Sequence, residues 1–205
     1  MRQRRTRIGL GVFVLAALVA IQCRAAGQMP TQTEIIRYTP AQSVANPRDG
    51  RCWTTSIAIP RPDAWRCMVG NEIFDPCFSL ADGKAVECGA NPAGGKAGFR
   101  LNLTEPLPKP EFTAESAAIA AKSGWLVVLA DGTSCNPATG TRAMVAGKMT
   151  AYYCESREGD GNTVLLDDLY TSGPLWHAEK AILAPGPGGP SLKKSVRVPV
   201  RTVYQ

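Results

Sequence analysis

The chain has one histidine, His177, among its 205 residues, and this scarcity limits the acid–base schemes that it could support. It has no G-x-S-x-G motif, which argues against a serine hydrolase built on a nucleophile elbow. It has no C-x-x-C pair, the spacing typical of zinc sites and of thioredoxin-like exchange. There is no internal repeat, and the apolar run at residues 8–21 is shorter than the ~20 residues of a membrane span. The sequence therefore predicts no cofactor and no metal, and it names no reaction.

Residues 1–25 have the features of a secretory signal peptide. Four arginines precede the apolar run, and Cys23-Arg24-Ala25 places small residues at the −3 and −1 positions of a cleavage site. We therefore expect a bacterial protein that is secreted, or held in the periplasm or cell envelope, with no membrane span once the signal is removed. Lipid anchoring at Cys23 is the alternative, although Gln22 is bulkier than the residue that lipoprotein processing needs.

The positive charge of the chain lies mostly in this leader. The full sequence has 23 basic and 17 acidic residues, a net charge of +6. Residues 1–25 contain five arginines and no acid, so the remainder has 18 basic against 17 acidic residues, or +1. A nearly neutral chain gives no electrostatic case for nucleic acid as a partner.

An even number of cysteines in an exported chain is typical of a disulfide framework. Six remain after the leader: Cys52, Cys67, Cys77, Cys88, Cys135 and Cys154. Cys135 and Cys154 lie apart from the others and flank one strand–loop–strand unit, so we expect them to pair. A hairpin turn at Asp82-Gly83 would place Cys77 opposite Cys88, which leaves the first two to pair with each other. The spacing alone leaves the pairing within the first four open.

Short strand-forming segments alternate with turn formers along the chain after the leader. About ten such segments predict a mainly β fold, either a small disulfide-stapled sandwich or one or more small barrels of short antiparallel strands. Little helix is expected. The one helical pattern is the alanine-rich segment 113–122, with Thr113 as its N-cap.

The domain organisation follows from shifts in composition. Residues 26–47 are rich in Gln, Thr, Pro and Ala and lack periodicity, so we predict a flexible N-terminal segment. The β domain is expected over residues 48–205. It is either one body or two lobes, 48–104 and 124–205, joined by 105–123.

The cysteines and tryptophans lie in a recurring local context. The matching segments are Cys52-Trp53, Asp63-Ala64-Trp65-Arg66-Cys67, Asp75-Pro76-Cys77-Phe78, Asp131-Gly132-Thr133-x-Cys135 and Tyr153-Cys154. This combination resembles one seen in uncharacterised secreted bacterial proteins. The resemblance implies a stapled, exported domain, and it implies no activity, ligand or catalytic residue.

His177 is the starting point of the one enzymatic hypothesis. It follows Trp176 and lies downstream of Asp167 and Asp168, so a histidine–carboxylate arrangement for hydrolysis is conceivable. A lone histidine beside a tryptophan is more typical of a packed or surface position. We therefore assign no catalytic residue, and His177 with Asp167 and Asp168 remains the alternative.

The pattern at the C-terminal end predicts a strand, residues 195–204, with basic residues on one face. Side chains alternate between the two faces of a strand. One face should therefore bear Val196, Val198 and Val200, and the other should bear Lys193, Arg197 and Arg201. Pro199 cannot donate to a ladder, so we expect this strand at a sheet edge. The basic residues either protect that edge from pairing or bind a polyanion.

These observations favour an exported, non-enzymatic binding protein of the cell envelope or the extracellular space, with an anionic envelope polymer as the candidate partner. The first alternative is a secreted hydrolase that uses His177 with a carboxylate. The second is a secreted proteinaceous inhibitor, for which the loop Asn91–Lys96 would present a rigid exposed surface.

Overall fold

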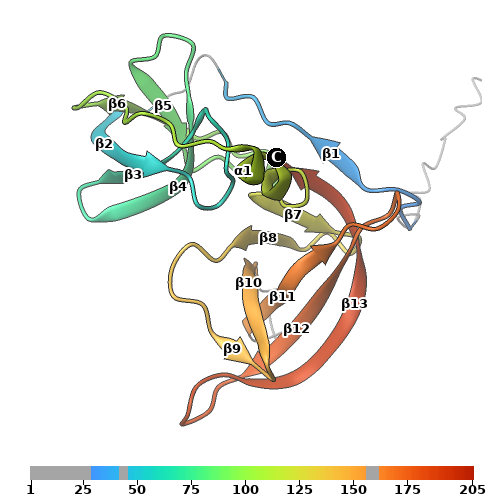
Figure 1. The fold of residues 1–205 in the computed structure, drawn as a ribbon. Coiled ribbons are helices and arrows are strands. Elements are labelled where there is room, and N and C mark those ends of the chain that lie inside the picture. The colour runs from blue at the N-terminus through green and yellow to red at the C-terminus, as the bar shows by residue number, and fades with distance from the viewer. Residues whose placement is uncertain (1–28, 42–45, 156–161) are drawn as a thin grey trace, which may run out of the picture.

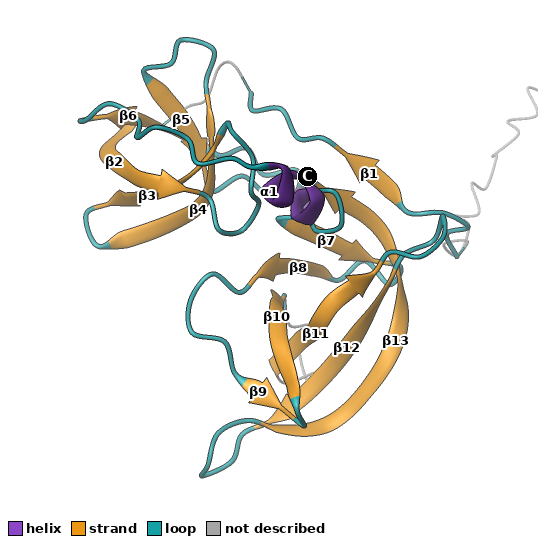
Figure 2. Ribbon diagram, in the orientation of Figure 1, coloured by secondary structure: helices purple, strands orange, loops and turns teal. Residues whose placement is uncertain are grey.

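The computed structural model describes residues 29–41, 46–155 and 162–205. It is mainly β, with two small closed barrels and one short helix (Figures 1 and 2). The predicted fold class is confirmed, and of the two predicted architectures the chain forms barrels. The predicted signal peptide and Cys23 lie outside the described residues.

The first barrel is a run of five consecutive strands that closes on itself. Its strands are β2 (Arg48–Thr55), β3 (Ala64–Val69), β4 (Glu72–Ser79), β5 (Ala85–Cys88) and β6 (Phe99–Leu103). Neighbours along the chain pair antiparallel, and β6 pairs parallel with β2 to complete the ring. The predicted turn at Asp82-Gly83 joins β4 to β5, with Gly83 at a φ of +63°, where a side chain would be strained.

The second barrel has six strands, each antiparallel to the next. They are β7 (Leu126–Leu129), β8 (Ser134–Pro137), β10 (Lys148–Cys154), β11 (Asn162–Tyr170), β12 (His177–Ala184) and β13 (Ser191–Tyr204). β13 returns to pair with β7, which closes the ring. A further short strand, β9 (Met144–Val145), forms a hairpin with β10. Leu165, Val127 and Val200 are among the fully buried side chains that fill this barrel.

A strand that the sequence did not indicate lies before the first barrel. β1 (Glu34–Ile36) pairs parallel with the end of β13, although residues 26–47 were expected to be flexible. The hydroxyl of Thr33 donates to the carbonyl of Val200 at 2.8 Å and accepts from the backbone N–H of Trp176. The three residues of β1 are exposed or half-buried, so this strand is held largely by main-chain pairing that composition does not reveal.

β13 is an edge strand over only part of its length. Residues 191–199 pair with β12, and no strand of the described chain pairs with the other edge of residues 191–198. From Val200 to Tyr204, β7 and β1 flank the strand on both sides, so the predicted edge position is wrong for this part. Pro199 is tolerated because it lies one residue before the pairing with β7 begins, and its carbonyl accepts from the N–H of Ala130.

The helix forms where the sequence predicts it. α1 (Ala114–Ala120) begins after Thr113, whose hydroxyl accepts a hydrogen bond from the backbone N–H of Ser116 at 3.1 Å. The helix has no fully buried residue and lies between the two barrels along the chain. Nowhere in the described ranges is there a helix with the length and apolarity to span a bilayer.

Three disulfides join neighbouring strands within the barrels. Cys52–Cys67 links β2 to β3, Cys77–Cys88 links β4 to β5, and Cys135–Cys154 links β8 to β10. These are the three pairs expected from the spacing and the hairpin turn. Each pair lies directly opposite in its ladder, so the bonds reinforce pairings that the strands already make.

The two barrels share an apolar junction centred on Trp125. Its ring lies 5.2 Å from that of Tyr38, 5.4 Å from Phe78 and 6.2 Å from Tyr204, measured between centroids. Phe78 belongs to β4 of the first barrel and Tyr204 to β13 of the second. Trp125 therefore contacts the N-terminal segment and both barrels at once.

Arg61 ties the same junction together with polar contacts. Its guanidinium donates to the carboxylate of Asp63, to the carbonyl of Tyr38 at 3.1 Å and to the carbonyl of Gln205 at 2.7 Å. It also lies 4.8 Å from the ring centroid of Phe78. The buried guanidinium of Arg61 therefore forms hydrogen bonds to the N-terminal segment, to the first barrel and to the residue after β13.

Candidate functional site

The predicted basic residues lie on a part of β13 that is open to solvent. Residues 191–197 are all exposed, and the turn that joins β12 to β13 projects away from the first barrel (Figure 1). We call residues 191–201 of β13 the basic segment. It contains Lys193, Lys194, Arg197 and Arg201, and the chain has no Asp or Glu from residue 180 to residue 205.

Arg197 contacts an aromatic ring of a strand that is not its neighbour in the sheet. Its guanidinium lies 3.9 Å from the ring centroid of Tyr170 at the end of β11, a cation–π contact. It stands opposite Glu179 of β12, whose carboxylate accepts from Lys148 and Tyr170. Among the described residues, the ion pair of Glu179 is with Lys148, and Arg197 forms none with it.

The ion pair beside Arg197 shifts the titration of both its members. The hydrogen bond from Lys148 lowers the pKa of Glu179, against a smaller opposing effect of burial. The hydrogen bond to Glu179 in turn raises the pKa of Lys148. Both groups stay charged at neutral pH, so Lys148 adds a positive group to this face while Glu179 offsets it.

Lys193 and Arg201 do not share a face with Arg197 by simple alternation. Lys193 is the unpaired residue at a register shift, because Leu192 faces Leu183 and Lys194 faces Ile182. Arg201 lies at a second shift, and its guanidinium donates to the carbonyl of Ala130. The single basic face that the sequence predicted is therefore interrupted at both ends.

Lys194 and Lys148 are basic residues of this region that the sequence analysis did not select. Lys194 adjoins Lys193, so the absence of acids from residue 180 onward would have pointed to it. Nothing in the sequence near Lys148 signals its position, because it reaches the site from β10.

His177 is not assembled with the carboxylates that a hydrolase would need. It begins β12, opposite Tyr170 and Pro199, and none of its hydrogen bonds or ion pairs among the described residues involves a carboxylate. Asp167 accepts from the backbone N–H of Met149 at a bulge in β11. Asp168 lines a shallow hollow beside α1 that His177 does not line.

We expect His177→Ala to leave the protein folded. The side chain is half-buried and makes no polar contact among the described residues, so its loss should cost about 1 kcal/mol or less. Chemical denaturation followed by circular dichroism measures this cost. A folded His177→Ala protein that lost a measurable hydrolytic activity would instead support the enzymatic alternative.

The tryptophans divide between core and surface. Trp65 packs in the core of the first barrel beside its two disulfides, and its indole N–H donates to the hydroxyl of Ser79 at 2.7 Å. Trp176 packs against the core that contains Cys135. Trp53 is 40% exposed, with the guanidinium of Arg66 5.7 Å from its ring centroid. One exposed ring does not form an extended stacking surface.

The loop Asn91–Lys96 is compact and closed at its base. The backbones of Asn91 and Lys96 exchange two hydrogen bonds of 2.9 Å, and a 3-10 turn, η1 (Pro92–Gly94), fills the loop. The side chain of Asn91 also donates to Glu155 of the second barrel. The loop is thus anchored to both barrels, with Ala93 to Lys96 exposed.

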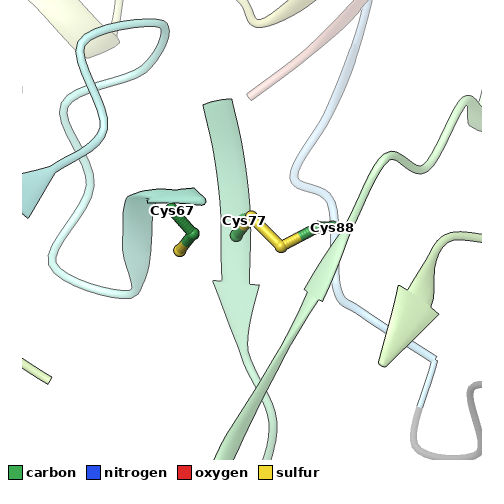
Figure 3. A group of neighbouring side chains, drawn as sticks. All are labelled: Cys67, Cys77 and Cys88. Atoms are coloured by element: carbon green, nitrogen blue, oxygen red, sulfur yellow. A yellow bond between two sulfur atoms is a disulfide. The ribbon is translucent and has the colours of Figure 1, made fainter. Parts of the chain in front are cut away.

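Three sulfur atoms of the first barrel lie close together. The Sγ atoms of Cys67, Cys77 and Cys88 are all within 4.8 Å of one another (Figure 3). Each belongs to a disulfide, the first with Cys52 and the other two with each other. A disulfide sulfur is not a thiolate, so in this state the group offers no ligand set for a metal.

No family model, curated protein or solved structure matches the chain. The features that bear on its function are therefore its own: the exposed basic segment, the anchored loop and the three disulfides. Of these, the basic segment is the one with a marked charge of one sign.

Proposed function

We propose that the chain is an exported, non-enzymatic binding protein that attaches to an anionic polymer of the cell envelope or extracellular space. The observation that carries the proposal is the basic segment. Lys193, Lys194 and Arg197 are exposed, and none forms an ion pair with a carboxylate among the described residues. An exposed cluster of unneutralised cations attracts polyanions.

Export is supported by the disulfides and by the leader. Three disulfides are typical of a protein that folds in an oxidising compartment. The basic run and apolar stretch of residues 1–25 are typical of a secretory signal. An exported protein of this kind meets envelope polymers and not nucleotides, which favours an anionic polymer as the ligand.

An extended polymer suits the shape of this site better than a small ligand. The cations are spread along an exposed strand that rises ~3.3 Å per residue, so an extended chain can contact them one after another although they do not share a single face. Stacking on Tyr170 restricts the guanidinium of Arg197 and lowers the entropy lost on binding. All the contacts are exposed, so the attachment should be weak and sensitive to salt.

The expected result is that Lys193→Gln/Lys194→Gln/Arg197→Gln releases the protein from isolated bacterial cell walls at low salt. Three exposed contacts of ~0.5 kcal/mol each predict roughly tenfold weaker binding. Sedimentation with cell walls over a salt series measures the effect, and the parent should itself be released as salt increases.

A matched variant separates local charge from net charge. Lys84→Gln/Lys109→Gln/Arg142→Gln removes the same three charges from exposed positions outside the basic segment. This control variant should bind walls as the parent does. Walls stripped of anionic polymer should bind neither the parent nor the control variant. Equal sedimentation of all three proteins would show that the basic segment only protects an open edge.

A further inference from the structure

The two disulfides of the first barrel lie side by side in one core. Cys52, Cys67, Cys77 and Cys88 all belong to a single buried cluster with Trp65, Val86 and Leu101. Figure 3 shows Cys67 on one strand next to the Cys77–Cys88 bond, and the three Sγ atoms lie within 4.8 Å of one another. Cys67 is therefore close to two sulfur atoms to which it is not bonded.

The four cysteine residues differ slightly in their exposure to solvent. Cys52 keeps 4% of its surface exposed, whereas Cys67, Cys77 and Cys88 keep none. Cys52 also lies outside the group of three close sulfurs. A thiol arriving from solvent thus meets Cys52 first, and the sulfur released by that attack is the one that faces the second disulfide.

We propose that Cys52 is the entry point of a thiol–disulfide relay that ends at Cys88. An external low-molecular-weight thiol, ionised to its thiolate, attacks Sγ of Cys52. The Cys52–Cys67 bond breaks, a mixed disulfide forms on Cys52, and the electron pair leaves with Cys67 as a thiolate.

In the second step the Cys67 thiolate attacks Sγ of Cys77. A Cys67–Cys77 bond forms, the Cys77–Cys88 bond breaks, and Cys88 leaves with the electron pair. It then takes up the proton that the external thiol lost. Attack falls on Cys77 because β3 and β4 are neighbouring strands, whereas β5, which bears Cys88, lies one strand further away. One external thiol is consumed and the number of disulfide bonds, counting the mixed one, stays at two.

The relay makes a core bond of the first barrel sensitive to thiols outside it. The second barrel provides an internal comparison, because Cys135–Cys154 has no other cysteine in its core cluster. Exchange there would stop at the mixed disulfide. This property does not depend on the proposed attachment to a polymer.

The test treats the oxidised protein with a monothiol under native conditions, traps free thiols by alkylation and maps the peptides. We expect a mixed disulfide on Cys52, a Cys67–Cys77 peptide and an alkylated Cys88. The matched variant Cys67→Ser removes the relaying sulfur, so its Cys77–Cys88 bond should break at least tenfold more slowly at the same thiol concentration.

A second variant tests the relay without added thiol. Cys52→Ser leaves Cys67 unpaired from the start, so the purified protein should contain a Cys67–Cys77 fraction beside the native Cys77–Cys88 pair. If this variant does not fold, the experiment on the parent and Cys67→Ser decides alone. Alkylation of Cys67 with Cys77–Cys88 intact in the thiol-treated parent, or equal rates of Cys77–Cys88 loss in parent and Cys67→Ser, would overturn the proposal.

Discussion

Trp125→Ala should lower the free energy of unfolding by ~3–5 kcal/mol, the range found for truncating a buried tryptophan. The side chain is 3% exposed and contacts Tyr38, Phe78 and Tyr204, so its removal opens a cavity where the two barrels meet. This loss is a large share of a typical net stability. Denaturant unfolding followed by far-ultraviolet circular dichroism, with the disulfides intact, measures it.

The control is Trp125→Phe, which keeps an aromatic ring at the same place. The indole N–H of Trp125 has no hydrogen-bond partner among the described residues, and a buried unpaired donor costs ~1–3 kcal/mol. Phenylalanine removes that cost while losing some volume, so we expect less than half of the destabilisation of Trp125→Ala. Equal losses in the two variants would show that the ring contacts do not set the stability of the junction.

Arg61→Ala should cost about 3 kcal/mol, because it leaves Asp63 without its partner and removes a donor from two carbonyls. Arg61 is 5% exposed and makes these contacts from three of its nitrogen atoms. The same unfolding experiment measures the loss. The effect should fall on the whole molecule, since Arg61 contacts the N-terminal segment, the first barrel and the end of β13.

Arg61→Lys distinguishes the shape of the guanidinium from its charge. An ammonium group keeps the positive charge but lacks the planar fork that reaches Asp63, Tyr38 and Gln205 together. We therefore expect Arg61→Lys to retain less than half of the unfolding free energy that Arg61→Ala loses. Recovery to the stability of the parent would mean that charge alone holds this site.

Local features of the fold were predictable from the sequence because short-range patterns determine them. The hairpin at Asp82-Gly83 needs only a turn that accepts a positive φ, and it places Cys77 opposite Cys88. The helix after Thr113 needs only a capping hydroxyl and a run of alanines. Each of these depends on residues close together in the chain.

Features that depend on distant partners were missed or were wrong in part. β4 runs unbroken from Glu72 to Ser79 across Pro76, a residue that cannot donate to a ladder. β1 and the closure of β13 against β7 join segments far apart in sequence, so no pattern within one segment indicates which strand it pairs with. Hydrophobic periodicity reports which face of a strand is buried, but not which strand lies beside it.

In the candidate site, too, local features were predictable and features that depend on distant residues were not. Strand alternation predicted that Lys193, Arg197 and Arg201 share a face, and register shifts beside the first and the last of them interrupt that pattern. A bulge adds one residue without any required sequence change, so alternation cannot reveal it. The stacking of Arg197 on Tyr170 was likewise invisible, because Tyr170 reaches it from β11.

The pairing of β13 with β7 and β1 also sets the order in which the chain can fold. The first barrel is made from one contiguous stretch, so its contacts close short loops and can form early. The second barrel cannot close until β13 is available, and the side-chain contact of Thr202 with Glu34 spans 168 residues. Because a chain is synthesised from its N-terminus, a finished first barrel would lie beside a second barrel that is still open. During that interval the edge of β7 that later meets β13 has no partner, and it is the place where a chaperone, a protease or another chain would act first.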